Sequence, residues 1–180
     1  MAKILTNKQI HLKNVNEYRK NMRKFLLTSR FNQETWNENK KYREKNANVG
    51  CIYCCPDPVT HQIPKESIMF VLEMNNDTNK IMGIGMVRNK SLSHRIRVYN
   101  DCNYNRYIYT GKTRIEREEM NIDEEEVMKV FDVLCFKGTR HMKRGQGLKS
   151  YPVELLYNCS RMLDLVDFIS NMFKTRLSNK

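Results

Sequence analysis

The chain contains few of the residues that break regular structure, and it lacks long apolar runs. Its 180 residues include seven glycines and four prolines, and alanine occurs only at Ala2 and Ala47. We find no internal repeat, no low-complexity linker and no run of 18 apolar residues, which excludes repeat proteins and predicts no transmembrane helix. With 40% hydrophobic and 29% charged residues, the composition is that of a globular domain and not of a disordered chain.

A secretory signal is also missing from the sequence. The first eight residues contain neither the apolar stretch nor the small-residue cleavage site of such a signal. We therefore expect an intracellular protein in a reducing compartment, with the six cysteines present as thiols.

Acidic residues are scarce relative to basic ones. The chain has 32 Lys and Arg residues against 20 Asp and Glu residues, which gives a net charge of +12. Residues 1–50 alone carry a net charge of +8. An excess of this size favours a polyanionic partner, with nucleic acid as the first expectation and an anionic membrane surface as the second.

The basic N-terminal region, residues 1–49, is predicted to be helical. Asn14 and Glu17 have the spacing of a capping box, and a helical face follows them, formed by Val15, Tyr18, Met22, Phe25 and Leu26. A second helix, lying on the surface, is predicted over residues 32–46.

Residues 50–180 are predicted to form an α+β core domain. The apolar segments 68–74 and 80–88 flank a polar turn and predict a β-hairpin, and the alternation at 95–98 and 106–109 predicts two further strands. Acidic residues 123–126 begin a helix, while 127–136 fits either a helix or a strand. Pro152 opens a C-terminal helical region whose apolar face contains Leu155, Met162, Leu165, Ile169, Met172 and Phe173. The expected architecture is a small mixed or antiparallel sheet or barrel with helices on both flanks.

The loop 137–149 is the first candidate for a binding site. It contains glycines, which allow backbone amides to approach an anion, and it has no acidic residue. Its basic side chains could contact phosphates, and Gln146 could contact a base edge. The residues assigned to this site are Lys137, Arg140, His141, Lys143, Arg144, Gln146 and Lys149. A mobile cationic loop without a partner is the alternative interpretation.

The segment 95–117 is the second candidate, because it alternates cations with tyrosines. Aromatic faces beside cations suit single-stranded nucleic acid, whose bases stack while its phosphates pair. The candidate residues are Arg95, Arg97, Arg106, Tyr104, Tyr107 and Tyr109. In an alternating strand, however, about half of the tyrosines should point into the core. The single tryptophan, Trp36, could be either a packing anchor or a stacking platform.

A zinc site is a third and weaker interpretation. Cys51, Cys54, Cys55 and His61 resemble half of a zinc site in residue type and spacing. The second half is missing, so we expect no cofactor unless tertiary structure completes the site.

The segment from Met69 to Val87, MFVLEMNNDTNKIMGIGMV, resembles the central hairpin of PUA-like domains, including the EVE and YTH branches. This resemblance implies a small β-barrel with flanking helices that binds RNA or modified bases in a cleft, although the tryptophans that YTH domains use are not matched. The chain as a whole, including residues 136–147, also resembles uncharacterised proteins of giant nucleocytoplasmic DNA viruses. That resemblance implies a viral protein in the host cytoplasm, the viral factory or the virion.

Three functions follow from these patterns. The leading hypothesis is a non-enzymatic nucleic-acid-binding domain that prefers RNA or single strands. The alternative is a virion or assembly protein that neutralises packaged genome or an acidic partner and oligomerises through its Met-rich C-terminal helix. The third is a nuclease-like enzyme, which would require Glu73, Asp77 or Asp101 to lie near His94 or His141.

Overall fold

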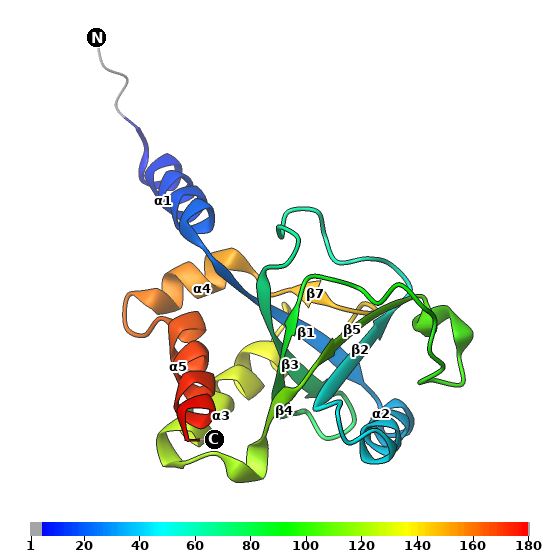
Figure 1. Cartoon of the computed structure of the whole chain (residues 1–180). Coiled ribbons are helices and arrows are strands. Elements are labelled where there is room, and N and C mark those ends of the chain that lie inside the picture. Colours follow the sequence, from blue (N-terminus) through cyan, green and yellow to red (C-terminus); the bar gives the residue numbers. More distant parts are fainter. Residues whose placement is uncertain (1–4, 180) are drawn as a thin grey trace.

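The computed structural model describes residues 5–179, which contain five α-helices and seven β-strands (Figure 1). In chain order these are α1 (Asn7–Asn21), β1 (Lys24–Phe31), α2 (Gln33–Lys45), β2 (Cys51–Cys55), β3 (Ile68–Asn75), β4 (Lys80–Arg88), β5 (Tyr107–Gly111), β6 (Thr113–Glu116), α3 (Ile122–Phe136), β7 (Lys149–Ser150), α4 (Val153–Ser160) and α5 (Leu165–Ser178). Two short 3-10 helices, η1 (Cys102–Asn105) and η2 (Arg117–Glu119), flank β5 and β6.

Five of the strands form one mixed sheet in the order β6-β4-β3-β1-β7. β1 is parallel to β3, and the other neighbours in this sheet are antiparallel. β2 and β5 form a separate antiparallel ribbon. Only Lys112 separates β5 from β6, so one extended stretch of chain serves both sheets. The α+β expectation is confirmed, whereas the barrel alternative is wrong, because the five-stranded sheet stays open.

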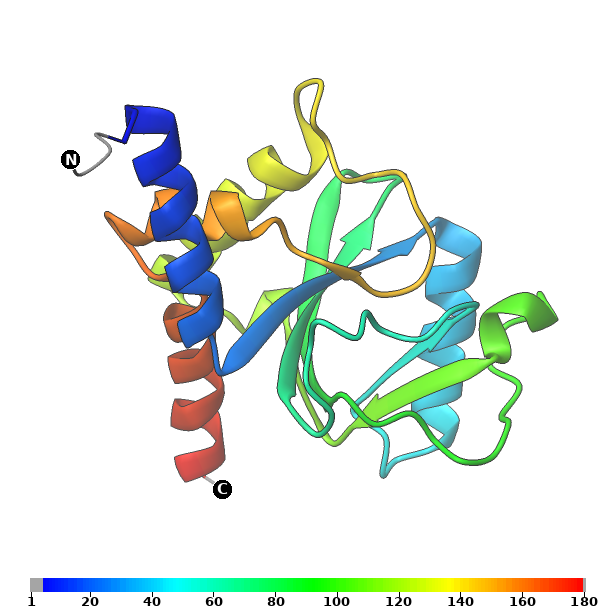
Figure 2. The same cartoon turned by 90° about the horizontal axis from the view of Figure 1, so that it is seen from above.

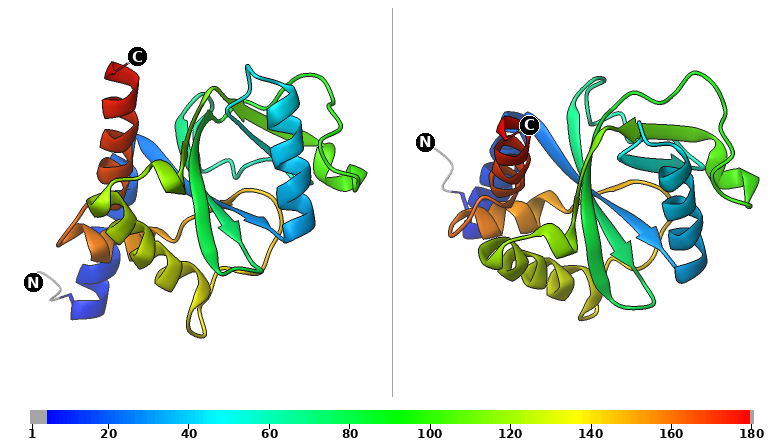
Figure 3. Two further views of the ribbon diagram at one scale, coloured as in Figure 1. Left: turned by 90° about the horizontal axis from the view of Figure 1, so that it is seen from below. Right: turned by 60° about the horizontal axis from the view of Figure 1, so that its bottom comes forward.

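The large sheet lies between two hydrophobic layers (Figures 2 and 3). Helices α3, α4 and α5 pack on one face, where Phe70 of β3 stacks on Phe173 of α5 with ring centroids 5.2 Å apart. The β2-β5 ribbon and α2 pack on the other face, where Val71, Tyr53 and Trp36 belong to one buried cluster. Because successive strand residues point to opposite faces, neighbouring residues of β3 supply different layers.

Several predicted elements are confirmed. β3 and β4 form the expected hairpin, with Ile68 opposite Arg88 and Asn75 opposite Lys80. α2 and α3 begin at asparagine caps, Asn32 and Asn121, whose side chains accept the backbone N–H three residues later. Residues 127–136 continue α3 as a helix, and Pro152 directly precedes α4.

The N-terminal region differs from the prediction. The capping box that begins α1 is formed by Thr6 and Gln9, and the helix ends at Asn21. Residues 24–31 form β1 between β3 and β7, so the expected helix over Phe25 and Leu26 is wrong. A continuous apolar run fits a buried strand as well as a buried helix, and pairing with β3 determines the outcome here.

Two further expectations are wrong. Residues 95–98 form no strand, because the N–H groups of Val98 and Tyr99 donate to Oδ1 of Asn105 instead of to a neighbouring strand. Met162 lies in the turn between α4 and α5 and is 96% exposed. The other residues predicted for that apolar face lie in the core or pack against it. No helix within residues 5–179 is long and apolar enough to cross a membrane.

A buried ion pair lies within the large sheet, and Tyr53 of the β2-β5 ribbon bonds to it. The side chains of Glu73 in β3 and Arg114 in β6 are 2% and 4% exposed. Nε of Arg114 donates to both carboxylate oxygens of Glu73 at 3.1 and 2.9 Å, and the hydroxyl of Tyr53 in β2 donates to Oε1 of Glu73 at 2.7 Å. Burial opposes the charge on Arg114, but the charge of Glu73 and the hydrogen bonds to it raise the pKa of Arg114 overall. Burial and the charge of Glu73 likewise raise the pKa of Tyr53, which keeps its hydroxyl protonated as a donor.

Removing one partner of this pair should destabilise the fold strongly. We expect Glu73→Ala to lower the free energy of unfolding by roughly 3–5 kcal/mol, because it removes the buried partner of Arg114 and leaves the guanidinium only its pair with the exposed Glu116 at 2.6 Å. Urea denaturation measures this change. The matched control is Glu66→Ala, which removes a carboxylate from an exposed pair with Lys90 and should change stability by at most about 1 kcal/mol. Equal effects of the two substitutions would contradict a structural role for the buried pair.

Candidate nucleic-acid interface

Two side chains attach the loop 137–149 to the sheet. The loop leaves α3 and returns beside β1 as β7 (Figure 2). Nε of Arg30, near the end of β1, donates to the carbonyl oxygen of Met142 at 2.5 Å. Nδ2 of Asn76, directly after β3, donates to the carbonyl oxygen of Lys143 at 3.0 Å. Because β1 and β3 are parallel, their carboxyl ends lie side by side, and the loop is held at that edge.

A cavity of about 200 Å³ opens between this loop, the end of β1, the start of α2 and η1. We call it the loop cavity. The residues that line it are Ser29, Arg30, Phe31, Asn32, Thr35, Cys54, Asn76, Tyr99, Tyr104, Gly145, Gln146 and Gly147. No Asp or Glu is among them. Burial and the neighbouring Cys55 raise the pKa of Cys54, so this thiol stays neutral, and Arg30 supplies the charge in the wall.

Aromatic side chains form part of this wall. Tyr104 is half-buried and meets Tyr99 edge to face, with ring centroids 6.3 Å apart and an interplanar angle of 73°. Asn105 fixes this arrangement, because its side chain accepts from two N–H groups at 98 and 99 and donates to the carbonyl oxygen of Tyr99 at 2.7 Å. The ring of Tyr104 is therefore held in the wall by its neighbours.

Two polar atoms of the lining residues lack partners. Nη1 of Arg30 and Oδ1 of Asn76 are buried and make no hydrogen bond with the described residues. Burial lowers the pKa of Arg30. A buried polar group without a partner costs about 1–3 kcal/mol, so a ligand that accepts from Arg30 and donates to Asn76 would recover this free energy.

The structure brings the two leading sequence candidates together. Gln146 of the loop and Tyr104 of the tyrosine segment both line the loop cavity. Lys137, Arg140, Arg144 and Lys149 are exposed, whereas His141 and Lys143 are half-buried, and Nδ1 of His141 accepts from the N–H of Lys143 at 3.4 Å. No carboxylate within residues 5–179 forms an ion pair with the five loop cations.

Other candidates of the segment 95–117 do not line the loop cavity. Arg95, Arg97 and Arg106 are exposed, and Tyr107 is half-buried on β5. Tyr109 is 2% exposed, and its hydroxyl accepts from the N–H of Val59 at 3.0 Å, so its ring belongs to the core.

Trp36 is also a packing residue. It is 8% exposed, meets Phe31 edge to face, and lies under the guanidinium of Arg114 at 5.5 Å. The ring is therefore a packing anchor of the buried cluster, with Arg43 also 5.7 Å from its centroid.

The predicted zinc ligands do not converge. Cys51, Cys54 and Cys55 are buried on β2, where adjacent residues point to opposite faces, and His61 is exposed. Burial raises the pKa of Cys51 and of Cys55 to about 12, which keeps both thiols neutral. Across residues 5–179, no group of three or more His, Cys, Asp and Glu side chains could hold a metal ion.

The carboxylates needed by a nuclease have other partners. Glu73 is paired with Arg114. Oδ2 of Asp77 accepts from the N–H of Gln33 at 2.7 Å, and Oδ1 of Asp101 accepts from the N–H of Asn103 at 2.9 Å. Each of these carboxylates therefore already accepts at least one hydrogen bond that stabilises the fold.

Sequence reasoning missed the cavity residues supplied by β1 and by the end of β3. Arg30 was missed because residues 1–49 were interpreted as helical, and a basic residue in an apolar strand is the signal that could have identified it. Asn76 could be recognised only as a turn former. Tyr99 belongs to the candidate segment 95–117, where it is one of the tyrosines that alternate with cations, but no pattern in the sequence places it beside Tyr104.

Comparison with known proteins finds no matching family model, no similar curated protein and no similar solved structure. The function is therefore argued from the geometry of the site.

Two glycines in the loop provide a test of its packing. Gly147 and Gly138 both have positive φ, of 65° and 80°, but a Cβ at Gly147 would lie 3.0 Å from Cβ of Cys55, whereas a Cβ at Gly138 would contact nothing. We expect Gly138→Ala to cost about 1 kcal/mol of unfolding free energy, from backbone strain alone. Gly147→Ala should cost about 1 kcal/mol more and should increase proteolysis of the loop. Thermal denaturation and limited proteolysis measure both, and equal behaviour of the two variants would contradict the packing of the loop on β2.

Proposed function

We propose that the protein is a non-enzymatic domain that binds single-stranded nucleic acid, with RNA preferred, and holds one unpaired base in the loop cavity. The observation that carries this proposal is the joint lining of one cavity by the cationic loop and by Tyr104. Charge alone would be weak support, because an exposed basic loop needs no partner. A cavity with an aromatic wall beside such a loop fits a base that is linked to phosphates.

The chemistry of the cavity suggests a division of roles. Tyr104 would stack on the base, and Gln146 would contact its edge together with Nη1 of Arg30 and Oδ1 of Asn76, which have no hydrogen-bond partner among residues 5–179. A donor and an acceptor of this kind complement the mixed donors and acceptors of a base edge. The exposed loop cations would contact the phosphates on either side and supply affinity that does not depend on sequence.

The rival functions receive less support from the geometry. An assembly protein that oligomerises through α5 would need the apolar face of that helix, but Ile169, Met172 and Phe173 are buried in the core. A nuclease would need converging carboxylates, and Glu73, Asp77 and Asp101 each have local partners. The PUA-like relationship, the viral origin and the intracellular location stay predictions.

Fluorescence anisotropy with labelled single- and double-stranded RNA and DNA, at several salt concentrations, tests the proposal. We expect Tyr104→Ala to weaken single-strand binding by about 5- to 100-fold, because base stacking contributes about 1–3 kcal/mol. The triple variant Arg140→Ala, Lys143→Ala, Arg144→Ala should also reduce the slope of log affinity against log salt by about 2.

Matched control variants distinguish binding in the loop cavity from nonspecific electrostatic binding to the basic surface. Tyr107→Ala removes a half-buried tyrosine outside the loop cavity, and a triple variant at Lys65, Arg161 and Lys174 removes three exposed cations elsewhere. Both controls should bind nearly as wild type does. Binding that is indifferent to Tyr104→Ala, or equally weakened by both triple variants, would leave only a cationic surface. No binding near physiological salt would refute the proposal and favour the assembly function.

A second substitution tests contact with the base edge. Arg30→Lys keeps the charge near the cavity but removes Nη1 and also Nε, the donor to the carbonyl oxygen of Met142. We expect the affinity for single strands to fall about tenfold or more, because hydrogen bonds from a charged donor are lost, while the salt slope stays unchanged. The same anisotropy titration measures both quantities, and urea denaturation confirms that the variant is folded. A changed salt slope with unchanged preference among bases would contradict this role for Arg30.

A further inference from the structure

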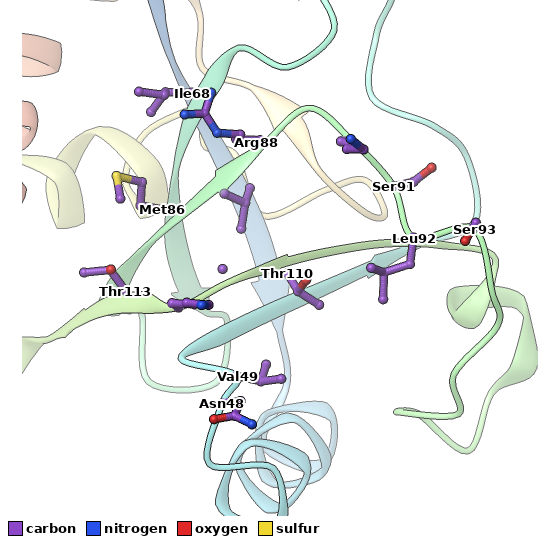
Figure 4. Close-up of a pocket in the computed structure, with 14 residues that line it drawn as sticks. Asn48, Val49, Ile68, Met86, Arg88, Ser91, Leu92, Ser93, Thr110 and Thr113 are labelled. Carbon is purple, nitrogen blue, oxygen red and sulfur yellow. The ribbon is translucent and has the colours of Figure 1, made fainter.

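A second and larger cavity of about 620 Å³ lies at the other end of the β2-β5 ribbon (Figure 4). We call it the strand cavity. It arises because the pairing of β4 with β6 ends at Met86 and Thr113, beyond which β4 and β5 diverge. A Cβ at Gly111 of β5 would overlap the carbonyl oxygen of Met86 of β4, so this close approach of the two strands requires glycine. Past that point the strands separate and leave the opening shown in Figure 4.

The strand cavity has an apolar wall. Its half-buried apolar residues come from both layers, because Val49 and Leu92 pack with the layer of the β2-β5 ribbon, whereas Ile68 and Met86 pack with the helical layer. A volume in this range, with apolar walls and a few polar groups, is typical of small-molecule sites. The wall suits the body of an organic ligand rather than a bare inorganic ion.

The polar groups of the strand cavity favour an anion. Its lining residues include Arg88, Lys90 and Lys112 but no Asp or Glu. Glu66, outside the lining, pairs with Lys90 at 2.9 Å and accepts from Nη1 of Arg88 through its carbonyl oxygen at 3.0 Å. Lys112 forms no ion pair with any carboxylate in residues 5–179, which leaves its charge available.

Hydroxyl groups complete the lining. Ser91, Ser93, Thr110 and Thr113 come from both sides of the opening (Figure 4). Hydroxyls beside a free lysine are suitable donors for the several oxygens of a phosphate group. Apolar side chains, hydroxyl groups and a lysine without an ion-pair partner in residues 5–179 therefore occur together in one cavity.

We propose that the strand cavity binds a phosphate ester with an apolar or planar body, of which a nucleoside monophosphate is the test ligand. Lys112 contacts the phosphate, the hydroxyls donate to its oxygens, and Leu92 and Val49 contact the body. Such a group could be a free nucleotide or one nucleotide of a bound strand. The five-residue ribbon puts roughly 15 Å between the two cavities, a distance that a short oligonucleotide can span.

Isothermal titration calorimetry with adenosine monophosphate, adenosine and inorganic phosphate tests this proposal. We expect the monophosphate to bind more tightly than either fragment. Lys112→Ala should weaken binding of the monophosphate about tenfold or more, because a charged hydrogen bond is lost. Leu92→Asn should weaken binding of the monophosphate without changing that of inorganic phosphate. The control Lys65→Ala removes an exposed lysine outside the cavity and should have no effect.

The variants also separate this proposal from the function proposed for the loop cavity. Binding of the monophosphate that survives Tyr104→Ala but not Lys112→Ala supports a site for a free nucleotide, whether or not the protein binds oligonucleotides. If the monophosphate does not bind but Lys112→Ala weakens oligonucleotide binding more than Lys65→Ala does, the ligand is a nucleotide of the strand. Three results would overturn the proposal. In the first, Tyr104→Ala abolishes binding of the monophosphate while Lys112→Ala leaves it unchanged. In the others, Lys112→Ala and Lys65→Ala weaken binding equally, or Lys112→Ala has no effect on the binding of any ligand.

Discussion

The ion pair between Glu73 and Arg114 is the interaction on which the arrangement of the two sheets depends. It joins β3 to β6 within the large sheet, and the hydroxyl of Tyr53 ties the β2-β5 ribbon to the same carboxylate. Trp36 of α2 packs over the guanidinium. A charge pair buried this deeply is tolerated only when its hydrogen bonds are made, so these elements must approach one another in one relative position.

This network also accounts for the glycines of β4. A Cβ at Gly85 would overlap the hydroxyl of Tyr53, and a Cβ at Gly83 would lie 2.8 Å from Nη2 of Arg114. The register of β3 against β4 shifts between Leu72 and Met74, at the position of Glu73 itself. Met82 and Gly83 of β4 lie opposite Glu73 alone, so the bulge is on β4. Glu73 faces the layer of Tyr53 by the regular alternation of β3, and the two glycines leave room beside it for Arg114 and Tyr53.

Local chemistry made part of this fold predictable. The β3-β4 hairpin, α2 and α3 follow from apolar runs, turn formers and asparagine caps that act over a few residues. β1 was not predictable in the same way, because Phe25 and Leu26 fit a helical face and only pairing with the distant β3 makes them a strand. The candidate site divides similarly. Gln146 and Tyr104 could be identified from the composition of their segments, which are a basic loop with glycines and a stretch of alternating cations and tyrosines. Arg30 and Asn76 lie near each other only because two parallel strands end at the same edge of the sheet.

The ion pairs also determine where the positive charge is available. Arg117 is paired with Glu125 and Asp132, and Arg176 with Glu124, so acidic residues of α3 neutralise the arginines that pack against it. The cations of the loop 137–149 and Lys112 have no such partners within residues 5–179. The net charge of +12 is therefore not evenly available. The unpaired cations include those beside the two cavities, where they would attract an anionic ligand.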